Sequence, residues 1–135
     1  MFRRTPVATP EFERVPLLDG LTQRELATVE RLTTPVDVPA GTVLAQEGAA
    51  GAEFFIVLDG RVDVVQGEEV IATRGAGAHL GEIALLGSCP RTATLVTATP
   101  VRTAVASRQE FRILLDEVPA LSERLTATME ARLAA

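Results

Sequence analysis

The sequence predicts a mainly β domain, a small sandwich or rolled barrel, with helices before and after it in the chain. Between residues 36 and 106, short runs rich in β-branched residues alternate with turn signals, a pattern typical of such folds. Before and after this region, apolar residues recur at helical spacing. A chain of 135 residues, 47% of them apolar, supports one domain with a modest aliphatic core.

The first helix is expected shortly after the start of the chain. Residues 1–15 carry mixed charges and prolines without a clear period, so we expect a loose arm. A turn over 16–20 comes next, and Thr22 and Glu25 then match a capping box at the beginning of a helix. Pro35 ends that helix, because proline cannot continue it.

Strands are expected where apolar residues recur at every second position instead of at helical spacing. Asp59-Gly60 lies between two apolar runs and predicts a hairpin. Arg61 and Arg74 are expected to be solvated turn charges. The predicted strands cover residues 35–38, 42–45, 54–58, 62–65, 70–73, 92–97 and 101–106.

Two further helices are expected at the end of the chain. Ser107 and Glu110 form a second capping box. Pro119 ends the helix that begins there and suits the first position of the next. In that last helix a slightly drifting apolar stripe recurs every four residues, at Leu121, Leu125, Met129 and Leu133.

The most informative stretch is residues 81–94, which reads GEIALLGSCPRTAT. Arg91 offers a planar set of donors that matches a phosphate, whereas Glu82 can accept a hydrogen bond from a sugar hydroxyl. The apolar run 83–86 predicts a helical turn whose free amides point at an anion. A phosphate and a sugar hydroxyl recognised side by side indicate a nucleotide.

This stretch also resembles the phosphate-binding cassette of cyclic nucleotide-binding domains, the family of catabolite activator proteins and of protein kinase regulatory subunits. The matching segments are GEIAL at 81–85 and PRTA at 90–93. The resemblance extends over 16–135 and implies a single domain after the arm 1–15. It also implies a β-roll, jelly-roll-like, of about eight strands with an N-terminal helix and two C-terminal helices.

The resemblance assigns roles to the residues of the cassette. It implies that Arg91 binds the cyclic phosphate and that Glu82 binds the ribose 2′-hydroxyl. The backbone amides of Ile83 and Ala84 complete the phosphate site. The alternatives are a solvated Arg91 and a Glu82 that is favoured at a helix N-terminus by the helix dipole.

Four further residues complete the expected site. Gly81 is more readily explained by the backbone conformation that glycine permits than by contact with the ligand. The Thr92 hydroxyl can contact the phosphate or, when the base is syn, the exocyclic amine of guanine. Leu125 and Met129 are the candidates for a lid over the base. The alternative for both is packing on the roll or on a second copy.

We therefore predict a non-catalytic sensor that binds a cyclic nucleotide, with cyclic AMP favoured over cyclic GMP as the expected ligand. It signals through its C-terminal helices, with a hinge near 118–119. Its output goes to an unknown effector protein, and the last helix is a candidate for homodimerisation. One alternative is a roll that has lost its ligand and serves as a protein-interaction module. Another is a fragment of a longer regulator, such as a transcription factor, channel, transporter or enzyme.

Composition argues against several other functions. The net charge of −5 argues against a nucleic-acid surface, and no apolar run reaches the ~18 residues of a membrane helix. One histidine, His79, and one cysteine, Cys89, cannot supply a metal cluster, and no cofactor other than the nucleotide ligand is expected. A single cysteine also forms no internal disulfide, which is consistent with the cytoplasm.

Overall fold

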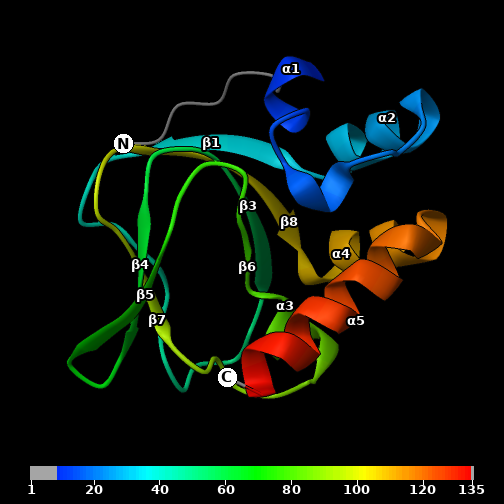
Figure 1. Cartoon of the computed structure of the whole chain (residues 1–135). Helices are drawn as coiled ribbons and strands as arrows, with labels where there is room; N and C mark the ends of the chain where they lie inside the picture. Colours follow the sequence, from blue (N-terminus) through cyan, green and yellow to red (C-terminus); the bar gives the residue numbers. More distant parts are fainter. Residues whose placement is uncertain (1–8, 135) are drawn as a thin grey trace.

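A computed structural model describes residues 9–134, and this part of the chain forms two four-stranded antiparallel sheets that close into a roll (Figure 1). The predicted mainly β fold, with helices before and after the strands, is confirmed. In spatial order, the first sheet contains β1 (Thr34–Val38), β8 (Val101–Ser107), β3 (Glu53–Asp59) and β6 (His79–Leu80). The second contains β2 (Val43–Ala45), β7 (Thr94–Thr97), β4 (Val62–Gln66) and β5 (Glu69–Arg74).

The larger helices lie on one side of the roll (Figure 1). They are α2 (Gln23–Arg31), α4 (Arg108–Glu117) and α5 (Pro119–Ala134), while the short α3 (Glu82–Leu86) interrupts the strands. Within residues 9–134, no helix has the length and hydropathy needed to cross a membrane.

Both predicted capping boxes are present. The backbone N–H of Glu25 donates to the Thr22 hydroxyl at 3.1 Å, and the Thr22 N–H donates back to the Glu25 carboxylate at 2.9 Å. Ser107 and Glu110 repeat this exchange at the start of α4, at 3.1 and 2.9 Å. Each box satisfies two donors that would otherwise lack partners at a helix N-terminus, which explains why both helices begin where the sequence indicated.

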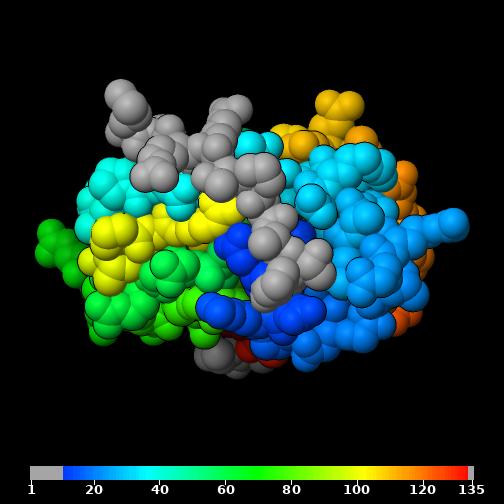
Figure 2. Space-filling view, turned by 90° about the horizontal axis from the view of Figure 1, so that it is seen from above, coloured from blue at the N-terminus to red at the C-terminus, as the bar shows by residue number. Residues whose placement is uncertain are grey.

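The N-terminal arm differs from the prediction in its described part. Residues 9–18 form α1 (Thr9–Phe12) and η1 (Pro16–Leu18), and they lie between the roll and α2, dark blue in Figure 2. Phe12 and Val15 are only 2% and 1% exposed, so this segment is packed and not loose. The sequence did not reveal this packing, because two isolated apolar residues show no helical or strand period. The rest of the predicted arm, residues 1–8, lies outside the described residues.

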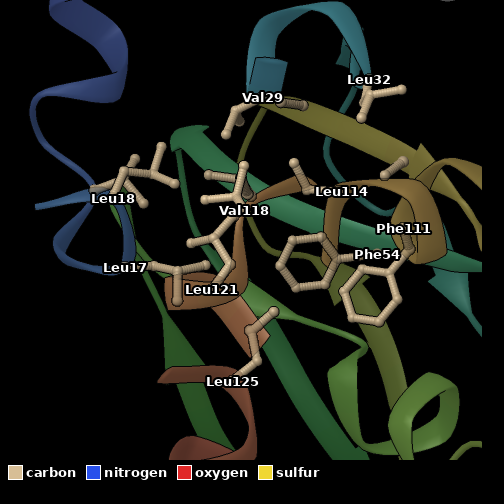
Figure 3. Packing of buried hydrophobic residues seen from close by; sticks show 14 of the residues in the cluster. Leu17, Leu18, Val29, Leu32, Phe54, Phe111, Leu114, Val118, Leu121 and Leu125 are labelled. Atoms are coloured by element: carbon tan, nitrogen blue, oxygen red, sulfur yellow. The ribbon is translucent and has the colours of Figure 1, made fainter. Parts of the chain in front are cut away.

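β3 separates two apolar cores. Phe54, Ile56 and Leu58 point to the helices, whereas Phe55 and Val57 point into the roll. On the helical side, Phe54 packs against Phe111 with ring centroids 4.9 Å apart. Figure 3 shows this core, in which the two rings belong to one cluster with apolar side chains of α2, η1, α4 and α5. Buried on both faces, β3 is a rigid support for the residues around it.

Three details of the strand prediction are wrong. Asp59-Gly60 does not close a hairpin, because it connects β3 in one sheet to β4 in the other. Gly60 has φ +92°, and a Cβ there would lie 2.3 Å from the Pro100 carbonyl oxygen, so the crossing requires glycine. The strand predicted over 92–97 begins only at Thr94, and the two-residue β6 was missed because it is too short to show a period.

Candidate functional site

A cavity of about 960 Å³ lies between the roll, α3 and the last turns of α5. All six residues predicted to bind the ligand line it, which places the Arg91 and Glu82 side chains at the same cavity. These residues are Gly81, Glu82, Ile83, Ala84, Arg91 and Thr92.

Arg91 is held at the wall of the cavity by backbone carbonyls. Its Nη2 donates to the Glu53 carbonyl at 2.6 Å and its Nη1 donates to the Gly81 carbonyl at 3.2 Å. The guanidinium carbon lies 5.9 Å from the centroid of the Phe55 ring. Only 7% of the residue is exposed. These contacts leave further guanidinium donors for a ligand, since arginine carries five N–H groups.

The charge of Arg91 is poorly compensated. Burial lowers the pKa of Arg91, and Coulomb attraction to Glu53 opposes this effect. Within residues 9–134, no carboxylate forms an ion pair with it. A buried cation that contacts only neutral carbonyls loses solvation without gaining a counter-ion, so an anion bound in the cavity would be strongly favoured.

Gly81 makes the position of Arg91 possible. It has φ +96°, a conformation that side chains rarely adopt. A Cβ at this position would lie 2.7 Å from the Glu53 carbonyl oxygen and 2.8 Å from Arg91 Nη1. The glycine therefore serves backbone geometry and also leaves space for the guanidinium.

Glu82 is completely buried at the first position of α3. Its Oε1 accepts a hydrogen bond from the Arg132 guanidinium, whose Nη2 also donates to the His79 carbonyl at 3.0 Å. In the part of the chain that the structure describes, Glu82 Oε2 has no partner. Burial raises the pKa of Glu82, and the charge of Arg132 counteracts this rise. One oxygen of this carboxylate thus remains available as an acceptor at the cavity.

Arg132 was not predicted from the sequence. It lies 50 positions after its partner, so no local motif links the two residues.

Close packing around α3 holds Ile83 and Ala84, the predicted amide donors, and a side-chain hydrogen bond holds Thr92. A Cβ at Gly51 would lie 2.5 Å from the Ala84 Cβ, so α3 packs directly against the loop between β2 and β3. As first-turn residues, Ile83 and Ala84 have amides without intrahelical partners. The Thr92 carbonyl accepts from Gln66 Nε2 at 3.0 Å, which ties the loop after Arg91 to β4.

The predicted lid residues require a correction. Leu125 is fully buried in the core beside Phe54 and Phe111, and neither Leu125 nor Met129 lines the cavity (Figure 3). A four-residue spacing rotates by about 40° per step around a helix of 3.6 residues per turn, so the apolar stripe leaves the core as α5 proceeds. The residues of α5 that line the cavity are Thr128, Ala131, Arg132 and Leu133.

No group of three or more histidine, cysteine, aspartate or glutamate side chains is arranged for a metal ion among residues 9–134. At the cavity, the Arg91 guanidinium suits an anionic group and the Glu82 carboxylate suits a hydroxyl donor.

Comparison with known proteins gives consistent matches. The family model described as cyclic nucleotide-binding domain matches residues 35–118. A cyclic nucleotide-gated potassium channel of Rhizobium etli is 34% identical over 114 residues, which cover 84% of this chain and 32% of the channel. The acetyltransferase Pat of Mycolicibacterium smegmatis is 31% identical over 139 residues, covering 100% of this chain and 41% of the enzyme.

Solved structures give the same result. The regulatory subunit of a cAMP-independent protein kinase A from Trypanosoma brucei, a mutant bound to cAMP in its A site, aligns with a TM-score of 0.82 and 25% identity. The alignment covers 93% of this chain and 48% of that chain. The chain thus spans less than half of the length of each of these three proteins.

Proposed function

The chain belongs to the cyclic nucleotide-binding domain family, and we propose that it senses a cyclic nucleotide bound in the cavity between the roll and α5. One observation carries the proposal. A buried guanidinium that has no counter-ion within residues 9–134, and a buried carboxylate with an oxygen that has no partner there, line the same cavity. A cyclic phosphate joined to a ribose hydroxyl complements both groups at once.

The phosphate is expected at Arg91. A charge-assisted contact with the guanidinium would compensate the burial of this cation, and it contributes about 1.5–3 kcal/mol. Ile83 and Ala84 line the cavity at the start of α3, and their backbone amides are expected to provide further donors. Thr92 lines the same cavity, and its hydroxyl is expected to complete the set.

The ribose is expected at Glu82. An ionised carboxylate accepts hydrogen bonds only, so its free Oε2 suits the 2′-hydroxyl as a donor. Oε1 keeps its contact with Arg132, and the ligand therefore need not displace the arginine.

The base is expected in the remaining part of the cavity, which is lined by Ile71 and Leu95 of the roll and by Leu133 of α5. Apolar side chains on both sides suit the faces of a purine. Cyclic AMP is the first candidate, because the aligned kinase regulatory subunit is bound to cAMP.

The signal is expected to arise from the last turns of α5. Leu121 and Leu125 anchor the first half of this helix in the core, while Arg132 connects its second half to Glu82. A ligand that binds more tightly when these turns are closed shifts the population towards the closed state.

The output is expected in another part of a longer protein or in a partner. The relatives include a channel and an acetyltransferase, and this chain aligns with less than half of each. We propose that the domain itself is regulatory and non-catalytic. Association of two copies through α5 stays a prediction.

Isothermal titration calorimetry with cyclic AMP and cyclic GMP tests the proposal. We expect binding by the unchanged protein and a loss of at least about tenfold in Arg91→Ala and Glu82→Gln. Arg112→Ala, at an exposed position of α4, is the matched control and should bind normally. Thermal unfolding of each variant shows whether it is folded. Flat titrations of the unchanged protein with both nucleotides would refute the proposal.

A further inference from the structure

Arg74 is a third arginine at the cavity wall, beside Arg91 and Arg132, and the proposed phosphate and sugar contacts do not involve it. It lies at the end of β5, is partly buried and lines the same cavity as Arg91. Within residues 9–134 its side chain forms no ion pair, and its buried Nε has no hydrogen-bond partner. A guanidinium can only donate hydrogen bonds, so its unsatisfied donors require an acceptor that the described chain does not provide.

The charges at the cavity wall are also unbalanced. Among the described residues, the lining contains Arg74, Arg91 and Arg132 but a single carboxylate, Glu82, in a chain whose net charge is −5. Arg132 is paired with Glu82, and a cyclic phosphodiester, which carries one negative charge, would compensate Arg91. Arg74 would still lack an acceptor in the complex of the proposed function.

The position of Arg74 in the fold indicates which part of the nucleotide lies near it. Arg74 ends β5, an edge strand of the second sheet, whereas Arg91 is held by the Glu53 and Gly81 carbonyls beside the first sheet. Burial lowers the pKa of His79 and raises that of Glu82, and the charge of Arg74 adds to the first shift and opposes the second. Arg74 therefore meets the cavity from a different side than the Arg91 phosphate site.

The base is the part of the ligand that extends beyond the sugar. Ile71 and Ala72 of the same strand line the cavity beside Arg74 and offer an apolar surface for a ring. A donor group at the end of such a surface can meet acceptors on the edge of the base.

We propose that Arg74 recognises the edge of a 6-oxopurine, donating to N7 and O6, so that the cavity binds cyclic GMP and cyclic IMP as well as cyclic AMP. Arginine pairs with these two guanine acceptors in a bidentate manner, whereas adenine presents an acceptor at N7 and an amino donor at position 6. The donor at position 6 opposes the donors of Arg74. This inference rests on the proposed function, because it assumes that a nucleotide occupies the cavity.

Calorimetric titrations with cyclic AMP, cyclic GMP and cyclic IMP test it. Cyclic IMP has N7 and O6 but lacks the 2-amino group, which separates the effect of Arg74 from any contact between Thr92 and that amine. We expect Arg74→Met to weaken binding of the two 6-oxo nucleotides by about tenfold or more, and binding of cyclic AMP by less than about threefold. Arg61→Met, an exposed arginine outside the cavity, is the control and should change neither affinity.

Arg74→Lys is the second variant and keeps the charge without the planar donor set. It should reduce the preference for 6-oxo nucleotides while leaving cyclic AMP binding unchanged, and it preserves the test if Arg74→Met does not fold. Equal losses for all three nucleotides would overturn the inference by placing Arg74 at the phosphate or sugar. Unchanged affinities would overturn it too, as would a loss for cyclic GMP that cyclic IMP does not share. Absence of any binding by the unchanged protein would refute the proposed function itself.

Discussion

Replacing Arg132 with alanine removes the guanidinium that pairs with the fully buried Glu82 carboxylate. Removing one partner of a buried ion pair typically costs about 3–5 kcal/mol, because the remaining charge is left uncompensated. Two features reduce this cost. The Arg132 side chain is 21% exposed, and Glu82 can take up a proton once its partner is gone. We therefore expect a loss of about 2–3 kcal/mol in the free energy of unfolding at pH 7.

The pH dependence of this loss follows from the same contact. Burial raises the pKa of Glu82 and Arg132 opposes the rise, so the pKa must rise further in Arg132→Ala. A carboxyl group whose pKa is higher in the folded state binds more protons there, and stability falls as the pH rises through that window. The variant should thus be most destabilised at neutral pH and approach the unchanged protein as the pH falls towards the ordinary pKa of a carboxyl group.

Urea unfolding followed by circular dichroism between pH 4.5 and pH 7.5 measures both effects. Arg31→Ala is the matched control, because it breaks an ion pair with Glu117 in which both side chains are about half exposed. Such surface pairs contribute about 0.2–1 kcal/mol. A double-mutant cycle with Glu82→Gln isolates the coupling between Arg132 and Glu82. If Arg132→Ala costs no more than the control, or if its cost does not depend on pH, the pair does not hold α5 and the reasoning is refuted.

Four other substitutions test the architecture of the site. Gly81→Ala should lower stability by about 1–3 kcal/mol and weaken nucleotide binding, since its Cβ would lie 2.7 Å from the Glu53 carbonyl oxygen; unchanged unfolding curves would contradict this. Burial lowers the pKa of His79 to about 4, so the unfolded chain is protonated first as the pH falls, and stability should decline by roughly 1.4 kcal/mol per pH unit below about 6.5. His79→Asn should flatten this decline in urea unfolding between pH 6.5 and pH 4, and an unchanged slope would exclude His79 as its cause. Leu125→Ala should cost about 2–5 kcal/mol in unfolding free energy, but Met129→Ala under about 1 kcal/mol. Weaker nucleotide binding in Met129→Ala with normal stability would restore Met129 as a lid residue.

Local signals in the sequence predicted much of the fold. The capping box of Thr22 and Glu25 involves groups three residues apart, so the printed sequence already contains the whole interaction. The division of the β3 side chains between the two cores is likewise a local property, because successive side chains of a strand point to opposite faces. The dense match over 81–93 includes the residues around Arg91 that line the cavity.

Interactions between distant segments were not predictable in this way. The turn Asp59-Gly60 has hairpin composition, yet the sheet that receives β4 depends on pairing with β7, about thirty residues later. The apolar stripe of α5 does not show which side of the helix faces the core and which faces the cavity. Leu125 was therefore predicted at the cavity, although it lies in the core. Arg74 resembles any solvated turn charge until the tertiary structure places it at the wall of the cavity.

By itself, the sequence determined the alternation of strands, the beginnings of the two capped helices and the residues of the cassette. Each of these depends on groups close together in the chain, where propensity and hydrogen bonding act locally. The tertiary structure alone decided that Arg132 pairs with Glu82 and that Arg74 lines the same cavity. The reason is physical: burial and electrostatic pairing depend on distance in space, and the folded chain brings these side chains together from separate elements.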